Sequence, residues 1–219
     1  HPDELVVLSD GELGSGHSSA SRIWLSEASD ALANFIKHIE KSNYAHNVLG
    51  YHICDGHFSE WFAWDSANFE RDVHALRWVC EANRGPHECP VPWPDYSKPM
   101  LEAFRNWLRS KYAEDIQLLR RAWNREKADF TNIEIPTKRE RVSSNYYSIR
   151  DPSKQMNAID YDLCFQDVHT DVMLGLCEMA KNMTKKLVGV FYGYTWTGFL
   201  RGFYMQNAGH LALHKVLRS

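Results

Sequence analysis

The residues best suited to chemistry lie in one stretch of the chain, 48–64, which begins as an apolar strand and ends among acids and indole rings. Val48 to Cys54 predicts a buried strand, and the turn at Asp55-Gly56 ends it. Glu60 then precedes Trp61, and Trp64 follows. Cleavage of a glycosidic bond needs a carboxylic acid whose pKa is raised by apolar neighbours. The pattern makes Glu60 a candidate for such an acid, and the alternative is a solvated carboxylate beside core tryptophans, since most acids at strand ends have no special role.

Two further apolar strands end in residues that suit sugar binding. Leu5 to Leu8 leads into Ser9-Asp10-Gly11, and Leu187 to Tyr192 leads into Gly193 and Tyr194. Acids and aromatic rings at strand ends are typical of a carbohydrate cleft. The residues expected to bind substrate are Asp10, His57, Trp61, Trp64, Tyr192, Tyr194 and Trp196, with Asp55 as the second candidate for the acid.

Helices are expected between and after these strands. Apolar spacing predicts one over 22–41, Ser97 caps another with Pro99 in its first turn, and Asp115 caps a third over 116–123. A long helix is expected from Pro152 to about 186, and a last one over 209–217. The segment 14–21 and the segment 124–150, with its charged run 138–141, are expected to be loops.

This order predicts an α/β fold, part of a (β/α)8 TIM barrel with a long insertion after the acid/base strand. Val48–Cys54 and Leu187–Tyr192 are expected to be neighbouring parallel strands buried on both faces. A complete barrel takes about 250 residues, so the alternatives are a piece of a barrel or an open α/β sheet. In a piece, the edges of Leu5–Leu8 and Leu187–Tyr192 would be unpaired or covered by a partner chain.

The chain resembles the catalytic barrel of the family 42-like β-galactosidases, which are retaining glycoside hydrolases. The resemblance lies in residues 1–11, 48–61, 97–123 and 187–194. It implies that residues 1–219 are one partial catalytic barrel, from about the exit of the third strand to the sixth-strand region. It also implies a β-galactosidase-like hydrolase acting on terminal β-linked sugars, with Glu60 as acid/base.

This sequence departs from the family's pattern at the position of the acid. The family's glutamate usually follows an asparagine directly, whereas here Asp55-Gly56 stands after the strand and Glu60 is preceded by Ser59. Asp55 takes the asparagine's place or is itself the acid. No residue matches the nucleophile glutamate of the family's seventh strand, so the chain alone is expected to be inactive. A non-catalytic carbohydrate-binding protein on the same barrel is the alternative function, and a structural or assembly domain is a third.

Composition narrows the classes of partner. A net charge of −3 without a basic run argues against nucleic acid, and no apolar run approaches the roughly 20 residues of a membrane span. Aromatic residues make up 13% of the chain, which suits a carbohydrate substrate. A homo-oligomer is compatible with the sequence. The cysteines are interpreted as reduced, which favours a cytoplasmic over a secreted protein and leaves the compartment open.

No cofactor is expected. Cys80, His87 and Cys89 could supply three zinc ligands, but a lost metal cluster is the favoured interpretation. His52 is expected to face inward with its hydrogen bonds satisfied, and His17, Ser18 and Ser19 indicate no catalytic triad.

Overall fold

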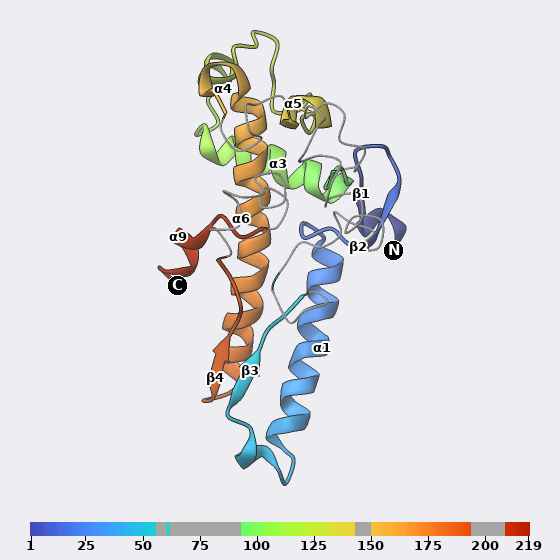
Figure 1. Ribbon diagram of the computed structural model, residues 1–219, viewed down its shortest axis with the longest axis vertical. Coiled ribbons are helices and arrows are strands. Elements are labelled where there is room, and N and C mark those ends of the chain that lie inside the picture. Colours follow the sequence, from blue (N-terminus) through green and yellow to red (C-terminus); the bar gives the residue numbers. More distant parts are fainter. Residues whose placement is uncertain (56–60, 62–92, 143–149, 194–208) are drawn as a thin grey trace, which may run out of the picture.

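The computed structural model describes residues 1–55, 61, 93–142, 150–193 and 209–219. The long helix α6 runs along much of the long axis of the molecule, with α1 beside it (Figure 1). The elements are η1 (Pro2–Glu4), β1 (Leu5–Val7), β2 (Leu13–His17), α1 (Arg22–Glu40), η2 (Ala45–Asn47), β3 (Gly50–His52), α3 (Lys98–Lys111), α4 (Ile116–Trp123), α5 (Lys138–Val142), α6 (Pro152–Met183), β4 (Leu187–Gly189) and α9 (Leu213–Val216). In this part of the chain no helix combines the length and apolar character needed to cross a bilayer.

β3 and β4 form a parallel pair, as the sequence predicts. Gly50 lies opposite Leu187, and His52 lies opposite Gly189. Gly50 has no room for a side chain, since a Cβ there would lie 2.5 Å from the Leu187 carbonyl oxygen. The strands are therefore held in close contact at their start.

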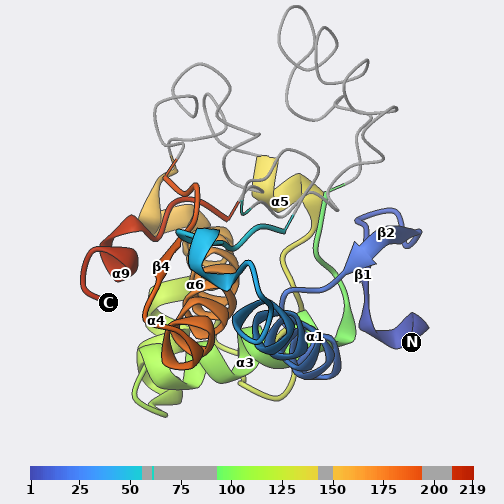
Figure 2. The same ribbon diagram turned by 90° about the horizontal axis from the view of Figure 1, so that it is seen from below.

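Only one face of this pair is buried, so the expectation of burial on both faces is wrong. Tyr51 and Ile53 pack into a core with Ile36 of α1 and Met173 of α6. Both helices lie on this side of the strands (Figure 2). On the opposite face Leu187 is 74% exposed. Among the described residues no element covers that face, because helix packing is confined to the side of Tyr51.

His52 lies on the exposed face, which corrects its expected inward orientation. The alternation along a strand puts His52 on the face opposite to that of the buried Tyr51. Its ring lies 4.6 Å from that of Phe191, which is also exposed. His52 is therefore not a core histidine.

The first strand belongs to a separate sheet. β1 pairs antiparallel with β2, so the segment expected to be a loop over 14–21 contains a strand. On the other side of β1, the Tyr96 N–H donates to the Val7 carbonyl at 2.7 Å, and the Ser9 N–H donates to the Trp93 carbonyl at 2.8 Å. The expected unpaired edge at Leu5–Leu8 is thus wrong, since the 93–96 segment covers it. In the described part of the chain, β4 pairs with β3 alone.

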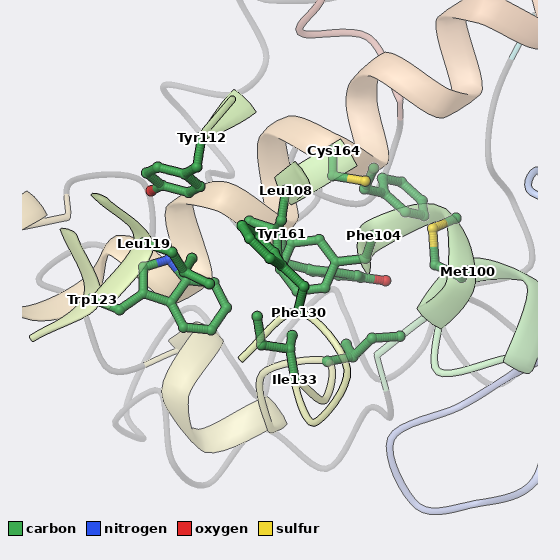
Figure 3. Packing of buried hydrophobic residues seen from close by; sticks show 12 residues of the cluster. Met100, Phe104, Leu108, Tyr112, Leu119, Trp123, Phe130, Ile133, Tyr161 and Cys164 are labelled. Atoms are coloured by element: carbon green, nitrogen blue, oxygen red, sulfur yellow. The ribbon is translucent and has the colours of Figure 1, made fainter. Parts of the chain in front are cut away.

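The predicted helices that correspond to α1, α3, α4 and α6 are confirmed, and their caps explain where they begin. The last predicted helix, over 209–217, is shorter than expected, since α9 covers only Leu213–Val216. The Ser97 hydroxyl accepts the Met100 N–H at the start of α3, and Asp115 accepts the Gln117 and Leu118 N–H groups at the start of α4. α4 ends at Asn124 in the left-handed conformation, which asparagine tolerates. The apolar faces of α3 and α4 meet α6 in a second core, where the Phe104 and Tyr161 rings pack edge to face at 5.2 Å (Figure 3).

The charged run 138–141 is helix α5 rather than an exposed loop. Arg141 on this helix is fully buried, with its guanidinium 4.6 Å from the Tyr161 ring centre and 5.0 Å from that of Trp93. It donates a hydrogen bond to the Pro94 carbonyl and lies 3.7 Å from the Asp162 carboxylate. The aromatic rings and the carboxylate offset the desolvation of the guanidinium, which is why a charged residue occupies a core position.

Candidate functional site

The carboxyl ends of β3 and β4 lie side by side and bring together residues from both strand exits. Beyond β3, the Ile53 N–H donates to the Gly189 carbonyl at 2.9 Å, and the Trp61 N–H donates to the Phe191 carbonyl at 3.4 Å. Asp55 and Trp61 also form an isolated parallel β-bridge with each other. The parallel arrangement thus carries Asp55 and Trp61 to the same end of the pair as Tyr192.

Asp55 meets a histidine that the sequence did not single out as a site residue. The His17 Nε2 atom, at the end of β2, lies 3.3 Å from an Asp55 carboxylate oxygen. The side chain of Asp55 remains 27% exposed, so solutes can reach the carboxylate. His17 stacks on Trp24 of α1, with ring centres 3.4 Å apart and planes 6° apart. The indole and the imidazole therefore fix one side of the carboxylate.

Trp61 is a wall of the site and not an open stacking face. Only 1% of the residue is exposed, and its indole N–H donates to the His169 carbonyl at 3.2 Å. Its ring lies 5.4 Å from the His169 ring. A buried indole at this position excludes water from the exit of β3.

His169 lies beneath the site, fully buried on α6. Its Nδ1 atom shares a hydrogen bond of 2.8 Å with the Ser19 hydroxyl, while its Nε2 atom has no partner among the described residues. Burial lowers the pKa of His169 to about 3, with the Asp55 carboxylate opposing that shift. With its pKa lowered in this way, the His169 ring is a weak proton acceptor, and its bond to Ser19 fixes the orientation of the ring.

Tyr192 and His210 form the floor on the β4 side. Their rings stack with centres 4.8 Å apart. The Tyr192 hydroxyl shares a hydrogen bond of 2.7 Å with the Thr170 hydroxyl and accepts the Ala212 N–H at 3.2 Å. Burial raises the pKa of Tyr192. Tyr192 therefore faces α6 and the 209–212 segment through its hydroxyl.

The remaining predicted site residues are distributed as follows. Asp10 lies in the β1–β2 turn, exposed, where its carboxylate accepts the Glu12 N–H at 3.1 Å. Its assignment assumed a shared sheet, and β1 is not in the sheet of β3 and β4. Outside the described residues lie Glu60, His57, Trp64, Tyr194, Trp196 and the metal candidates Cys80, His87 and Cys89. In the described part of the chain no three metal-ligating side chains gather.

The arrangement offers a reachable carboxylate, a neighbouring imidazole and a buried aromatic and histidine floor at one end of a parallel strand pair. Sequence reasoning missed His17, His169 and His210, which come from β2, α6 and the 209–212 segment. The segment Leu13 to His17 gives no strand signal of its own, because two of its five residues are glycines and one is large and apolar. Nothing in the local sequence around 169 or 210 distinguishes these histidines from surface ones.

Comparison with known proteins gives one family and a shared fold. A family model described as β-galactosidase, glycoside hydrolase family 42, matches residues 86–205. No curated protein matches the chain. Among solved structures, the β-galactosidase of the psychrophilic Marinomonas ef1 is similar over 89% of this chain, with 14% identity and a TM-score of 0.57. The β-amylase catalytic domain of Paenibacillus polymyxa is similar over 95% of this chain, with 16% identity and a TM-score of 0.67.

These likenesses show the fold of a glycoside hydrolase catalytic domain. The chain spans 25% of the length of the first structure and 47% of the second. The parallel β3–β4 pair with α6 packed along it agrees with part of such a domain.

Proposed function

The chain belongs to the glycoside hydrolase family 42 β-galactosidases, and from this membership we propose that it forms part of the barrel of a retaining hydrolase acting on terminal β-linked sugars. β-Galactosides are the first substrates to test. The observation that carries the proposal is the parallel β3–β4 pair, whose adjacent exits join Asp55 and Trp61 to Tyr192. Catalytic residues of barrel enzymes stand at such exits.

In the proposed reaction Glu60 is the acid/base. It protonates the departing glycosidic oxygen while a nucleophilic carboxylate, supplied from outside this chain, forms the glycosyl-enzyme. Glu60 then takes a proton from the water that releases the sugar. The position immediately after Glu60 is the anchored, buried Trp61, which supports an acid set at the rim of an apolar wall.

Asp55 has the supporting role in this proposal. Its carboxylate is partly exposed and lies beside His17, so it can accept a hydrogen bond from a sugar hydroxyl while His17 holds its orientation. It also remains the second candidate for the acid, because it stands directly after the strand.

The test compares Glu60→Gln with Asp55→Asn in the protein that carries this chain together with its nucleophile. We expect Glu60→Gln to lower hydrolysis of β-galactosides with poor leaving groups by about 10²–10⁴-fold. Aryl galactosides with good leaving groups should keep their first step, because they depart without protonation. Glu27→Gln, an exposed carboxylate on α1, is the matched control and should change nothing. Full activity of Glu60→Gln on a disaccharide, with loss in Asp55→Asn, would transfer the acid role to Asp55.

A non-catalytic carbohydrate-binding protein remains the second candidate, favoured by the Asp55-Gly56 pair where the family's acid pattern is expected. Calorimetric titration with galactose separates the two functions. Binding without turnover by the unmodified protein that carries this chain together with its nucleophile supports the second candidate, and turnover excludes it.

A further inference from the structure

His210 joins the two strand exits through both of its ring nitrogens. Its Nε2 atom hydrogen-bonds the Trp61 carbonyl oxygen, and its Nδ1 atom accepts the Gly193 N–H at 3.0 Å. A carbonyl oxygen only accepts, and a backbone N–H only donates. Only the neutral tautomer with the proton on Nε2 therefore satisfies both bonds at once.

The segment that carries His210 is itself fixed on several sides. Gly209 adopts a φ of +81° and packs against the His169 ring so closely that a Cβ would lie 2.0 Å from its Cδ2 atom. The Leu211 N–H donates to the Gln166 side-chain oxygen at 2.9 Å, and the Ala212 N–H donates to the Tyr192 hydroxyl. His210 is thus placed by main-chain contacts to α6 on both sides of it.

We propose that His210 is a positioning residue, which fixes the main chain directly after Glu60, at Trp61, to the main chain directly before Tyr194, at Gly193. This inference rests on the proposed function of Glu60. Glu60 directly precedes Trp61 in the sequence, and the proposal is that the anchor at Trp61 serves the acid next to it. A displacement of about 1 Å in a catalytic group costs up to about 100-fold in rate.

His210 has no catalytic role of its own in this arrangement. It is fully buried, and both ring nitrogens are engaged with the backbone. Burial lowers the pKa of His210 to about 4, so the ring is neutral where the enzyme would work, and the hydrogen bond to Trp61 opposes that shift. The residue can hold the two exits but cannot deliver a proton.

Three substitutions of His210 test the contribution of each of its two hydrogen bonds. His210→Gln places a donor near the position of Nε2 and can keep the bond to Trp61. His210→Asn places an acceptor near Nδ1 and can keep the bond to Gly193. His210→Phe keeps the stacking on Tyr192 and removes both bonds. His214→Phe, an exposed histidine on α9, is the matched control.

The measurement is kcat and KM on β-galactosides with poor and good leaving groups, with thermal unfolding of each variant. We expect His210→Phe and His210→Asn to lower kcat for poor leaving groups by about 10–100-fold, with good leaving groups spared. His210→Gln should recover most of that loss. If His210 had only a structural role, its substitution would instead lower kcat for both substrate classes together, in proportion to the folded fraction.

The results distinguish a failure of the His210 inference from a failure of the proposed function of Glu60. If Glu60→Gln shows the leaving-group selectivity and the His210 variants do not, His210 does not position the acid and this inference is overturned. If Glu60→Gln shows no selectivity, the proposed function itself fails, whatever the His210 variants do. If His210→Phe does not fold, the contrast between His210→Gln and His210→Asn decides.

Discussion

Single buried histidines make the stability of this chain depend on pH. His169 and His210 are neutral in the folded state, with pKa values of about 3 and about 4 caused by burial. An unfolded histidine takes up a proton below about 6.5. The stability from these two residues is therefore fully present above pH 6.5 and is lost as the pH falls toward their folded pKa values.

We expect the free energy of unfolding to drop steeply between pH 6.5 and 4, by about 1.4 kcal/mol for each unit of pKa shift. His169→Asn should flatten this dependence, because an amide can keep the contact to Ser19 and does not titrate. Urea unfolding at a series of pH values measures the effect. A variant with the unchanged slope would show that the His169 ring is not the titrating group.

Arg141 is a further residue on which stability depends. Replacing it with methionine removes the contacts to three aromatic rings, leaves the Pro94 carbonyl without its donor and deprives Asp162 of one of two guanidiniums. We expect Arg141→Met to cost about 3 kcal/mol of stability in urea unfolding. Arg139→Met, on the exposed side of α5, should stay within about 0.5 kcal/mol. Equal effects of the two substitutions would show that the aromatic and carboxylate contacts of the Arg141 guanidinium do not stabilise the fold.

These residues also mark where sequence reasoning ends. Arg141 belongs to a charged run, Lys138 to Arg141, and such a run predicts a solvent-exposed segment. Its burial depends on Trp93, Tyr96 and Tyr161, which come from distant parts of the chain. Likewise the contact of His17 with Asp55 joins β2 to the exit of β3. No local sequence pattern predicts such contacts between residues that are distant in the chain.

At the scale of elements, the helices α1, α3, α4 and α6 were predictable, whereas α5 was missed and the strand arrangement was only partly predicted. The caps Ser97, Asp115 and Asp151 mark the starts of α3, α4 and α6, and a proline in the first turn adds to the signal in α3 and α6. The parallel pairing of β3 with β4 followed from their apolar runs. β2 was missed because Leu13 to His17 carries two glycines and one large apolar residue. Its strand character comes from pairing with β1, which is a tertiary effect.

The 209–212 segment offers a test at this scale with a matched pair of glycines. Gly209→Ala must place a methyl group into the His169 ring and hold a positive φ, so we expect a loss of about 2 kcal/mol or more in stability. Gly175→Ala on α6 meets nothing within 4 Å, and we expect a gain of about 0.5–1 kcal/mol from helix propensity. Urea unfolding of both variants measures the difference. A neutral Gly209→Ala would mean that the segment does not pack on His169.

For the whole molecule, the outer face of the β3–β4 pair is the feature with the largest consequence. Leu187 and Phe191 are 74% and 57% exposed there, and β4 has one strand partner in the described part of the chain. An apolar face next to a strand edge is a ready surface for association. Chain length and composition could not reveal this exposure, because the same apolar runs would be buried in a sheet covered on both sides.

We therefore expect the 219-residue chain to self-associate as its concentration rises, through this face. Leu187→Lys should shift the population toward monomer, because a charged edge residue resists strand pairing. Size-exclusion chromatography with light scattering over a concentration series measures the shift. Leu13→Lys is the matched control, since Leu13 is 54% exposed but lies on β2 in the other sheet, and it should leave self-association unchanged. Identical profiles for the unmodified chain and Leu187→Lys would show that this face is not where the copies meet. An equal response to Leu13→Lys would show that added charge, and not the strand edge, sets the association.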